Sequence, residues 1–340
     1  TDPTNIKYLT GFCGVSLRER EAFVLVTHKK IYLLTYPVSL QENMPRKTSY
    51  QLLLITSSQK LDYHFLKIIR QENINSLGFE KDNLTVGEYD LWSEKVKVNW
   101  VPTCGVIENL RIIKTEEEIK KIEKAAVLTD KAYNFIRSEI KYGATEKYLA
   151  FELEYFIRKK GAEIAFPPII AFDSHSALPH HQPSNAKLKH NSLILIDLGA
   201  KVEGYCADMT RVLFFGAPVS RQAKIYETVL SAQKMALSQI IIGHSTGISD
   251  QTARKVIKQA GYPEYPHGLG HGVGLDIHEA PRLRSDSQEI LQENMVVTVE
   301  PGIYLEGVCG VRIEDLLVLK KSGLEILSKS PKFLKDSIIL

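Results

Sequence analysis

The sequence contains few cysteines. Its 340 residues include four, Cys13, Cys104, Cys206 and Cys309, which are widely scattered and form no Cys-x-x-Cys pair. This spacing argues against a disulfide framework and against a cysteine-rich zinc site. We therefore expect a soluble protein of a reducing compartment, the cytoplasm.

An excess of either charge and a long apolar run are also missing. The chain carries 43 basic and 40 acidic residues, a net charge of +3, which is too small to indicate nucleic acid or an anionic membrane. Its apolar runs, such as residues 193–196, have the length of a strand, whereas a membrane span needs roughly 18 residues. Hydrophobic residues make up 44% of the chain, which is enough for an ordinary globular core.

The length suggests about two domains, at roughly 150 residues per domain. In the first part, β-rich apolar runs at 22–27 and 31–36 flank a polar His28-Lys29-Lys30 and predict a hairpin. Residues 52–56 predict another strand, and residues 62–71 have helical spacing. With a break at Val101-Pro102-Thr103, these patterns predict an α/β domain over residues 1–110.

The rest of the chain repeats a pattern with a spacing of 100 residues. A capping box at Thr115-Glu116-Glu117-Glu118 opens a long helix that ends at Gly143, and a second helix runs from about Thr145 to Gly161. Helices expected at about 220–240 and 249–260 end at Gly243 and Gly261, each 100 residues later. We predict one α+β domain over residues 111–340, built from two similar halves with a site between them.

Two aspartates flank a predicted strand pair. Asp197 ends the run Leu-Ile-Leu-Ile-Asp, and Asp208 follows Gly-Tyr-Cys-Ala. If Val202 and Glu203 form a two-residue turn, the two carboxylates lie opposite each other, and a cation or a proton must relieve their repulsion. The alternative is that one aspartate caps a turn and the other is solvated.

Three histidines occur within twelve residues among glycines. His267 and His271 have the four-residue spacing of a helical zinc motif, but the intervening glycines disfavour a helix. We expect instead an extended glycine-rich strand that another backbone or a substrate approaches closely. On such a strand, His267, His271 and His278 are candidate ligands or substrate contacts.

Further carboxylates follow at the ends of strands. Glu300 ends an apolar run before Pro-Gly, and Arg312 and Glu314 share one face of a strand because side chains alternate. Alone, each glutamate could be a solvated strand end, and His180, in a loop before Asp197, is a weak candidate. Four carboxylates and one imidazole on strands of one domain are expected to suit Mn²⁺, Co²⁺, Fe²⁺ or Zn²⁺ in a hydrolytic site for two metals.

These residues and their flanking motifs resemble the metallopeptidases with the pita-bread fold. That family includes methionine aminopeptidase, Xaa-Pro aminopeptidase and Xaa-Pro dipeptidase (prolidase). The resemblance covers residues 111–340 and rests on five ligands in order: Asp197, Asp208, His271 in HGLGHGVGLDIH, Glu300 in VEPG and Glu314 in RIED. It implies a pita-bread catalytic domain.

The segment DPTNIKYLTGF, residues 2–12, resembles the smaller α/β domain, creatinase-like, of the Xaa-Pro branch. In relatives a helix and a strand usually precede this segment, so we expect that the domain over residues 1–110 lacks its first helix and strand. The branch often forms dimers through this domain, which implies a homodimer.

The resemblance also implies a role for each site residue. Asp208 and Glu314 would bridge two divalent ions, most readily Mn²⁺, while Asp197 would hold one ion and His271 with Glu300 the other. A hydroxide bridging the metals would attack the peptide bond, and Glu300 would carry its proton to the leaving nitrogen.

Other residues would contact the substrate or support the ligands. His180 and His278 would act in catalysis by contacting the scissile carbonyl, and His267 would lie in the substrate pocket. Arg312 would hold its neighbouring carboxylates in place.

The expected substrates are peptides with proline in the second position. We expect an Xaa-Pro aminopeptidase, with Xaa-Pro dipeptidase as the alternative, because no arginine can be assigned to the carboxylate of a dipeptide. A hydrolase of a non-peptide C–N bond and a binding protein that has lost catalysis are further alternatives, and the five intact ligands argue against both.

Overall fold

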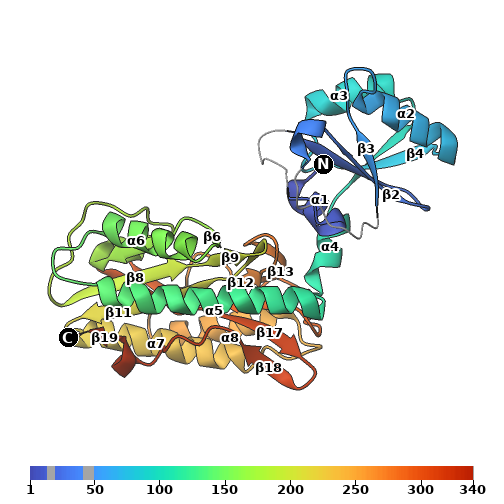
Figure 1. Cartoon of the computed structure of the whole chain (residues 1–340). Helices are drawn as coiled ribbons and strands as arrows, with labels where there is room; N and C mark the ends of the chain where they lie inside the picture. The colour runs from blue at the N-terminus through green and yellow to red at the C-terminus, as the bar shows by residue number, and fades with distance from the viewer. Residues whose placement is uncertain (14–19, 41–49, 340) are drawn as a thin grey trace. The chain divides into compact units, whose positions relative to one another are not determined.

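The computed structural model describes residues 1–13, 20–40 and 50–339, and it contains two compact units, Thr1–Leu110 and Arg111–Leu340. Figure 1 labels many of the helices and strands of both units. Within the described residues, no helix combines the length and the apolar character that crossing a membrane requires.

The N-terminal unit is an α/β unit, as predicted. Its sheets have the orders β1-β2-β3 and β4-β5, and the predicted hairpin is confirmed because β1 pairs antiparallel with β2 from Val26↔Ile31. Its elements are α1 (Pro3–Thr10), β1 (Ala22–Val26), β2 (Ile31–Thr35), η1 (Pro37–Ser39), β3 (Tyr50–Leu54), α2 (Leu61–Glu72), β4 (Ser76–Glu80), α3 (Val86–Lys95), β5 (Asn99–Thr103) and α4 (Val106–Ile112).

One prediction for this unit is wrong. The residues Val101-Pro102-Thr103 were expected to break the chain, but they belong to β5, which pairs in parallel with β4. Within the described residues β5 has only this one partner strand, so the missing N–H of Pro102 interrupts no second ladder.

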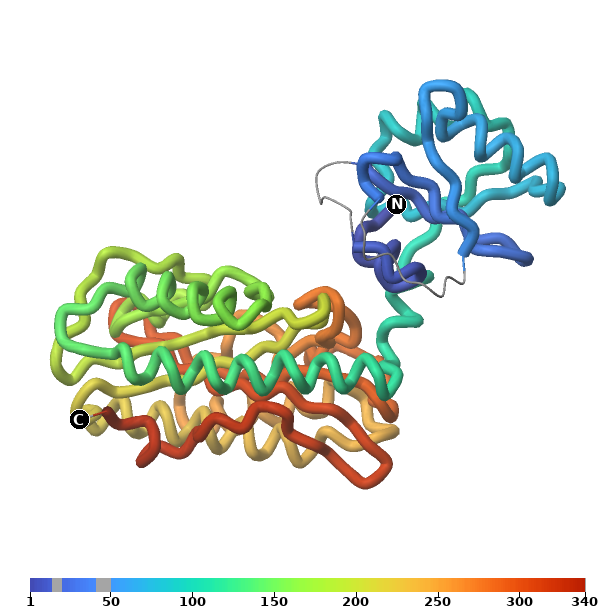
Figure 2. The backbone as a smooth tube through the Cα atoms, in the orientation of Figure 1, coloured from blue at the N-terminus to red at the C-terminus, as the bar shows by residue number. Residues whose placement is uncertain are grey.

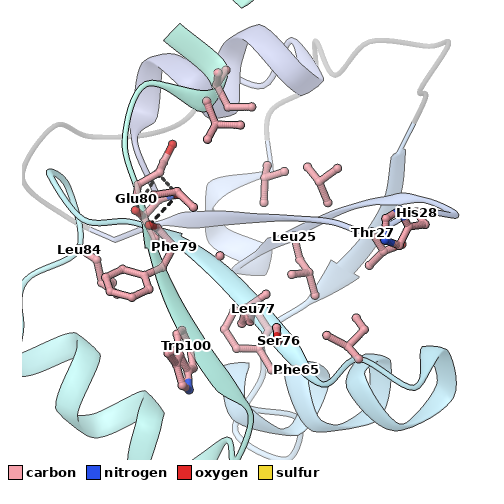
Figure 3. A pocket seen from close by; sticks show the side chains of 18 of the residues that line it. Leu25, Thr27, His28, Phe65, Ser76, Leu77, Phe79, Glu80, Leu84 and Trp100 are labelled. Carbon is pink, nitrogen blue, oxygen red and sulfur yellow. Dashed lines mark hydrogen bonds and ion pairs between the residues drawn. The ribbon is translucent and has the colours of Figure 1, made fainter. Parts of the chain in front are cut away.

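A cavity of about 700 Å³ lies in the N-terminal unit (Figure 3). Apolar side chains of β1, β4 and α2, including Leu25, Leu77 and Phe65, line much of it. Neither of the two groups of side chains in the described residues that could together hold a metal ion lies in this unit. The chemistry predicted from the sequence therefore belongs to the C-terminal unit.

The C-terminal unit repeats one arrangement of helices and strands. Figure 1 shows α5 and α6 of the first half in green, and α7 and α8 of the second half in yellow to orange, beside the strands. The first-half elements are α5 (Glu116–Glu139), α6 (Glu146–Lys159), β6 (Glu163–Ile164), β7 (Ile169–Phe172), η2 (Asp173–Ala177), β8 (Ser192–Leu198), β9 (Ala200–Val202), β10 (Tyr205–Cys206) and β11 (Met209–Phe215). The second-half elements are α7 (Ser220–Leu237), α8 (Thr246–Gln259), β12 (Gly270–Gly272), β13 (Glu279–Leu283), β14 (Val296–Val299), β15 (Gly302–Leu305), β16 (Cys309–Arg312), β17 (Asp315–Lys320), β18 (Gly323–Ile326), η3 (Leu334–Ser337) and β19 (Ile338–Ile339).

Sequence signals at the helix ends explain the repeat. Thr115 and Glu118 form the predicted capping box, and the helices end before glycines at positive φ, 79° at Gly143 and 91° at Gly243. One expected boundary is wrong: α8 begins at Thr246 rather than near Ser249, because Ser245 caps the helix through the Gly247 N–H.

The C-terminal unit contains two main sheets. In order they are β19-β11-β8-β7 and β13-β12-β14-β17-β18. The apolar faces of α5 and α6 pack on β7, β8 and β11, and α7 and α8 pack on the second sheet and on the other face of β8 and β11. The red segment at the end of the chain in Figure 2 leads back to β11, with which β19 pairs. Because the helices cover the faces of the sheets, the ends of the central strands are the place where a site can form.

Candidate metal centre

One cavity of about 740 Å³ in the C-terminal unit collects the predicted site residues. Both halves contribute to its walls. The nine predicted side chains all line it: Asp197, Asp208, His271, Glu300, Glu314, Arg312, His180, His267 and His278.

The expectation that all five ligand candidates sit on strands is wrong for three of them. Asp197 lies on β8 and His271 on β12. Asp208, Glu300 and Glu314 occupy irregular residues directly beside strand ends. A side chain beyond the end of a strand is released from the strict alternation of faces, so several carboxylates can turn toward one point.

The expected pairing of the two aspartates is also wrong. Asp197 is opposite Thr210 rather than Asp208, because the two-residue turn consists of Glu203 and Gly204 instead of Val202 and Glu203. Both turn residues have positive φ, 51° and 87°, the backbone conformation of a two-residue type I′ hairpin turn, which a glycine favours. The register therefore shifts by two residues, and Asp208 lies in the irregular residues just before β11.

The glycines around His271 allow backbones to approach closely, as predicted, although the strand is shorter than expected. β12 spans only Gly270–Gly272. A Cβ on Gly270 would lie 2.0 Å from the Thr298 carbonyl oxygen, and one on Gly272 would lie 2.1 Å from the Ala280 carbonyl oxygen. Larger residues would push β12 away from its neighbours and would displace the imidazole of His271.

The hydrogen bonds of His271 leave one ring nitrogen for a ligand. Its Nδ1–H donates to the Gly272 carbonyl at 3.1 Å, so Nε2 carries the lone pair. Nε2 lies 3.3 Å from Glu300 Oε1 and 3.6 Å from Asp208 Oδ2. Burial lowers the pKa of His271, which keeps the ring neutral and able to bind a metal.

Arg312 organises the carboxylates from the other side. Its guanidinium donates to Asp197 Oδ2 at 2.7 Å and to the Thr210 hydroxyl at 3.0 Å. The Thr210 hydroxyl in turn donates to Glu314 Oε2 at 2.7 Å. Because Arg312 is itself buried, these charge-assisted bonds fix the carboxylates in one geometry.

The concentrated negative charge has a direct effect on protonation. Burial, opposed by Arg312 and reinforced by Asp197, raises the pKa of Glu300 to about 8. Burial and the neighbouring Glu314 raise the pKa of Asp208 well above its usual range, and burial and Glu300 do the same for Glu314. A cluster of this kind is stable in its ionised form only when cations compensate it.

Two buried oxygen atoms identify where such cations fit. Among the described residues, Asp197 Oδ1 and Glu314 Oε1 have no hydrogen-bond partner, although buried polar atoms normally have one. Asp208, His271 and Glu314 each offer a ligand atom within 4.8 Å of the others. The donor set of carboxylate oxygens and one imidazole nitrogen fits hard to borderline divalent ions.

The remaining histidines lie around the metal ligands. The ring of His278 makes an edge contact with His271 at 4.3 Å between centroids. His267 donates from Nδ1 to the Gly268 carbonyl, and its Nε2 accepts the hydroxyl of Tyr304 at 2.9 Å. Burial lowers the pKa of both His267 and His278 to about 4, so both rings are neutral near pH 7.

Three side chains of the site were missed in the sequence. Thr210 and Thr298 each lie two residues from a ligand, and strand periodicity could have placed them on the same face. Thr298 donates to Glu300 at 3.3 Å. Tyr304 accepts a hydrogen bond from Arg312 at 2.8 Å, and no sequence signal indicated it because its position depends on the β15–β16 hairpin.

Comparison with known proteins places this site in a family. The model of metallopeptidase family M24 matches residues 120–321, and the model of the creatinase/prolidase N-terminal domain matches residues 1–113. The chain is 38% identical to the Xaa-Pro dipeptidase of Pyrococcus horikoshii over 331 residues, which is 96% of this chain and 91% of that protein.

Solved structures agree. An Xaa-Pro dipeptidase from Bacillus anthracis is 35% identical, with a TM-score of 0.93 over 100% of this chain and 94% of that one. An X-Pro aminopeptidase from Thermotoga maritima is 32% identical, with a TM-score of 0.90 over 99% and 94% of the two chains. The predicted pita-bread fold with a creatinase-like N-terminal domain is thereby confirmed. The chain belongs to metallopeptidase family M24, and it is a metallopeptidase that depends on divalent metal ions.

Proposed function

We propose that the protein is an Xaa-Pro dipeptidase with two divalent ions, Mn²⁺ in the cell. The observation that carries this proposal is the convergence of four carboxylates and one neutral imidazole on one cavity, with two buried carboxylate oxygens that lack partners. The name of the relatives, Xaa-Pro dipeptidase, supports the substrate class.

Five side chains would hold the ions. Asp208 and Glu314, whose pKa values burial and neighbouring carboxylates raise strongly, would contribute carboxylate oxygens. Asp197 and Glu300 would contribute further carboxylate oxygens, and His271 its Nε2 atom. When bound, the ions supply Lewis acidity and lower the pKa of a coordinated water toward neutrality.

The protein side chains would then handle protons and developing charge. Glu300 would accept a proton from the attacking water and deliver it to the prolyl nitrogen, which leaves poorly unless it is protonated. His180 and His278 would donate hydrogen bonds to the carbonyl oxygen as it becomes negative. Arg312 would keep Asp197 oriented through its bond of 2.7 Å.

The apolar part of the cavity would suit proline at the second position of the substrate. An Xaa-Pro bond has no N–H, so the ring must be recognised by shape rather than by a backbone hydrogen bond. One wall of the cavity is apolar, made by residues 166–169, and His267 would lie beside the substrate. The ring would pack on this wall.

Two arginines favour a dipeptide over a longer peptide. Arg282 and Arg284 lie two residues apart and both line the cavity. A dipeptidase needs a cation for the free carboxylate beside the proline, and either guanidinium would bind it. The second candidate, an Xaa-Pro aminopeptidase, is favoured by the likeness to the Thermotoga maritima X-Pro aminopeptidase.

One set of assays distinguishes these functions. Hydrolysis of an Xaa-Pro dipeptide, an Xaa-Pro-Xaa tripeptide and a Met-initiated peptide is measured with Mn²⁺ and with a chelator. We expect cleavage of the dipeptide that requires metal. Cleavage of the tripeptide alone would favour the aminopeptidase, and cleavage of none by protein with two bound ions would contradict both.

The arginines provide a sharper test. In the double variant Arg282→Ala, Arg284→Ala, loss of a charge-assisted bond should raise KM for the dipeptide roughly 10-fold or more. The KM for a dipeptide amide, which lacks the carboxylate, should be unchanged and serves as the control. Equal effects on both substrates would contradict carboxylate recognition.

We also propose that the protein is a homodimer. The proposal is supported by the resemblance of its N-terminal unit to the domain through which the Xaa-Pro branch often pairs. Light scattering coupled to size-exclusion chromatography should give twice the chain mass of 38.4 kDa, and a mass that stays at one chain across concentrations would contradict the proposal.

A further inference from the structure

A second cluster of titratable side chains lies outside the metal centre. Glu146 is the first residue of α6, and its side chain is fully buried. It accepts five hydrogen bonds, two on Oε1 and three on Oε2. The donors are the Phe172 N–H at 2.8 Å, His175 Nδ1 at 2.9 Å, His181 Nε2 at 2.9 Å, the Ser184 N–H at 2.9 Å and the Ser184 hydroxyl at 2.6 Å.

These donors come from both ends of one loop. Phe172 ends β7, Ser184 lies twelve residues later, and between them Pro179 and His180 line the cavity of the metal centre. His181, which directly follows His180, is held by Glu146. One buried carboxylate therefore fixes the entry and the exit of the loop that carries a histidine into the site.

The two halves of the loop differ in their other anchors. The first half is tied to strands independently of Glu146, because Asp173 accepts from the Leu193 N–H at 2.9 Å and the Ser176 hydroxyl accepts from the Gly310 N–H at 2.7 Å. The second half, after Leu178, is held by Glu146 through His181 and Ser184, and at its end also by the Lys147 N–H, which donates to the Ser184 carbonyl at 3.0 Å. His180 lies in this second half, so its placement depends most on Glu146.

The position suits an ionised carboxylate. The N-terminus of a helix favours negative charge, and Thr145 caps α6 at the adjacent residue. Despite burial, hydrogen bonds from Ser184, His181 and Phe172 lower the pKa of Glu146. The group is charged at neutral pH and keeps all five donors satisfied.

The same cluster has the composition of a metal site. Glu146, His175 and His181 each offer an atom within 4.8 Å of the others. However, both oxygens of Glu146 are already occupied by five donors, two of which are backbone N–H groups that a cation would have to displace. Every carboxylate oxygen has its partners here, in contrast to the unpartnered oxygens of Asp197 and Glu314. The hydrogen-bonded arrangement is therefore the functional one.

We propose that Glu146 is a positioning residue that sets His180 against the substrate by clamping the loop over residues 172–184. The proposal rests on the proposed function, in which His180 donates a hydrogen bond to the scissile carbonyl. Glu146 itself does not line the cavity, so it acts through the loop.

The test is a double-mutant cycle with Glu146→Gln and His180→Ala, assayed with an Xaa-Pro dipeptide and Mn²⁺. Loss of a carbonyl contact should lower kcat of His180→Ala about 100-fold. Glu146→Gln keeps hydrogen bonds to only some of the five donors, so His180 should move. A displacement of a catalytic group by about 1 Å can lower the rate about 100-fold, so kcat should fall roughly 10- to 100-fold while KM stays nearly unchanged. In the His180→Ala background, Glu146→Gln should reduce kcat by no more than about 2-fold, because the two residues act as a unit.

The controls separate positioning from folding. Glu154→Gln changes a partly exposed glutamate on the same helix, which forms an ion pair with Arg158, and should leave kcat unchanged. Ser184→Ala removes one hydroxyl donor and keeps the carboxylate. If Glu146→Gln does not fold, Ser184→Ala takes its place in the test, and its kcat should be several-fold lower than that of the wild type.

The possible outcomes are distinct. An equal fall in kcat on adding Glu146→Gln to wild type and to His180→Ala would overturn the positioning role while leaving the proposed function intact. Full activity in His180→Ala would overturn the role of His180 in the proposed function and the positioning role with it. Coupling between the two variants with bound metal retained supports the proposal.

Discussion

In both halves of the C-terminal unit, the first residue of the second helix anchors the helix to a neighbouring segment, but the chemistry of the anchor differs. Glu146 and Thr246 are the first residues of α6 and α8, 100 residues apart, and each ties the helix N-terminus to a segment beside the cavity. The Thr246 hydroxyl donates to the Arg282 carbonyl at 3.0 Å, and it also forms a hydrogen bond of 2.7 Å with the Ser287 hydroxyl. The first half uses a buried charge, and the second half uses a neutral hydroxyl.

The difference follows what each segment carries. The loop held by Glu146 presents His180, which we assign to the reacting carbonyl. Thr246 instead holds the end of β13, which presents Arg282 and, just beyond the strand, Arg284; we assign these two to the far end of the substrate. Chemistry at the carbonyl needs a precisely placed donor, whereas a long guanidinium side chain can adjust to a carboxylate. In this assignment the charged anchor serves the residue at the reacting carbonyl, and the neutral anchor serves the residues at the far end of the substrate.

The metal centre itself joins the two halves, and its loss is the largest effect we expect. Asp208→Ala or Glu314→Ala removes one proposed metal ligand, from the first and the second half respectively. Each should lower kcat/KM by about 10³-fold or more, the scale of several kcal/mol of lost transition-state stabilisation. Peptide hydrolysis and metal content measured side by side check this, and circular dichroism controls for folding. Unchanged activity in either variant would rule out a centre shared by the halves.

The two anchors should differ in their effect on stability. Glu146→Gln leaves buried donors poorly paired and should lower the free energy of unfolding by about 3 kcal/mol, whereas Thr246→Val should lower it by only about 1 kcal/mol. Urea unfolding of both variants in the absence of metal measures the difference. Equal destabilisation would contradict the contrast between a charged and a neutral anchor.

The smallest effect we expect is on the pH dependence of stability, which should also distinguish the charged anchor Glu146 from the neutral anchor Thr246. The pKa of Glu146 is lowered from its ordinary value of 4.5, so its ionised form stabilises the fold. This contribution is fully present above pH 4.5 and is lost as the pH falls through the folded-state pKa. The stability gap between wild type and Glu146→Gln should therefore shrink below pH 4.5, while the gap to Thr246→Val stays constant. A gap to Glu146→Gln that widens on acidification would show the opposite linkage.

Much of this architecture could be predicted from the sequence because local signals are strong. The capping box at Thr115 and the glycines at helix ends fixed the repeat, and five chemically distinctive residues in a known order identified the metal-binding class. The strand partner of Asp197 could not be predicted, because it depends on which two residues adopt positive φ in the turn. These are Glu203 and Gly204 rather than Val202 and Glu203. Tyr304 and Glu146 were missed because their roles arise from contacts between segments far apart in the chain.

The central claim is that two metal ions, held jointly by the two halves, drive hydrolysis of Xaa-Pro peptides. The most direct test removes metal with a chelator, adds Mn²⁺ in steps, and measures bound metal and dipeptide hydrolysis on the same samples. We predict no activity in the metal-free protein and full activity at two ions per chain. Full hydrolysis by protein shown to contain no metal, or saturation with ions but no hydrolysis, would contradict the claim.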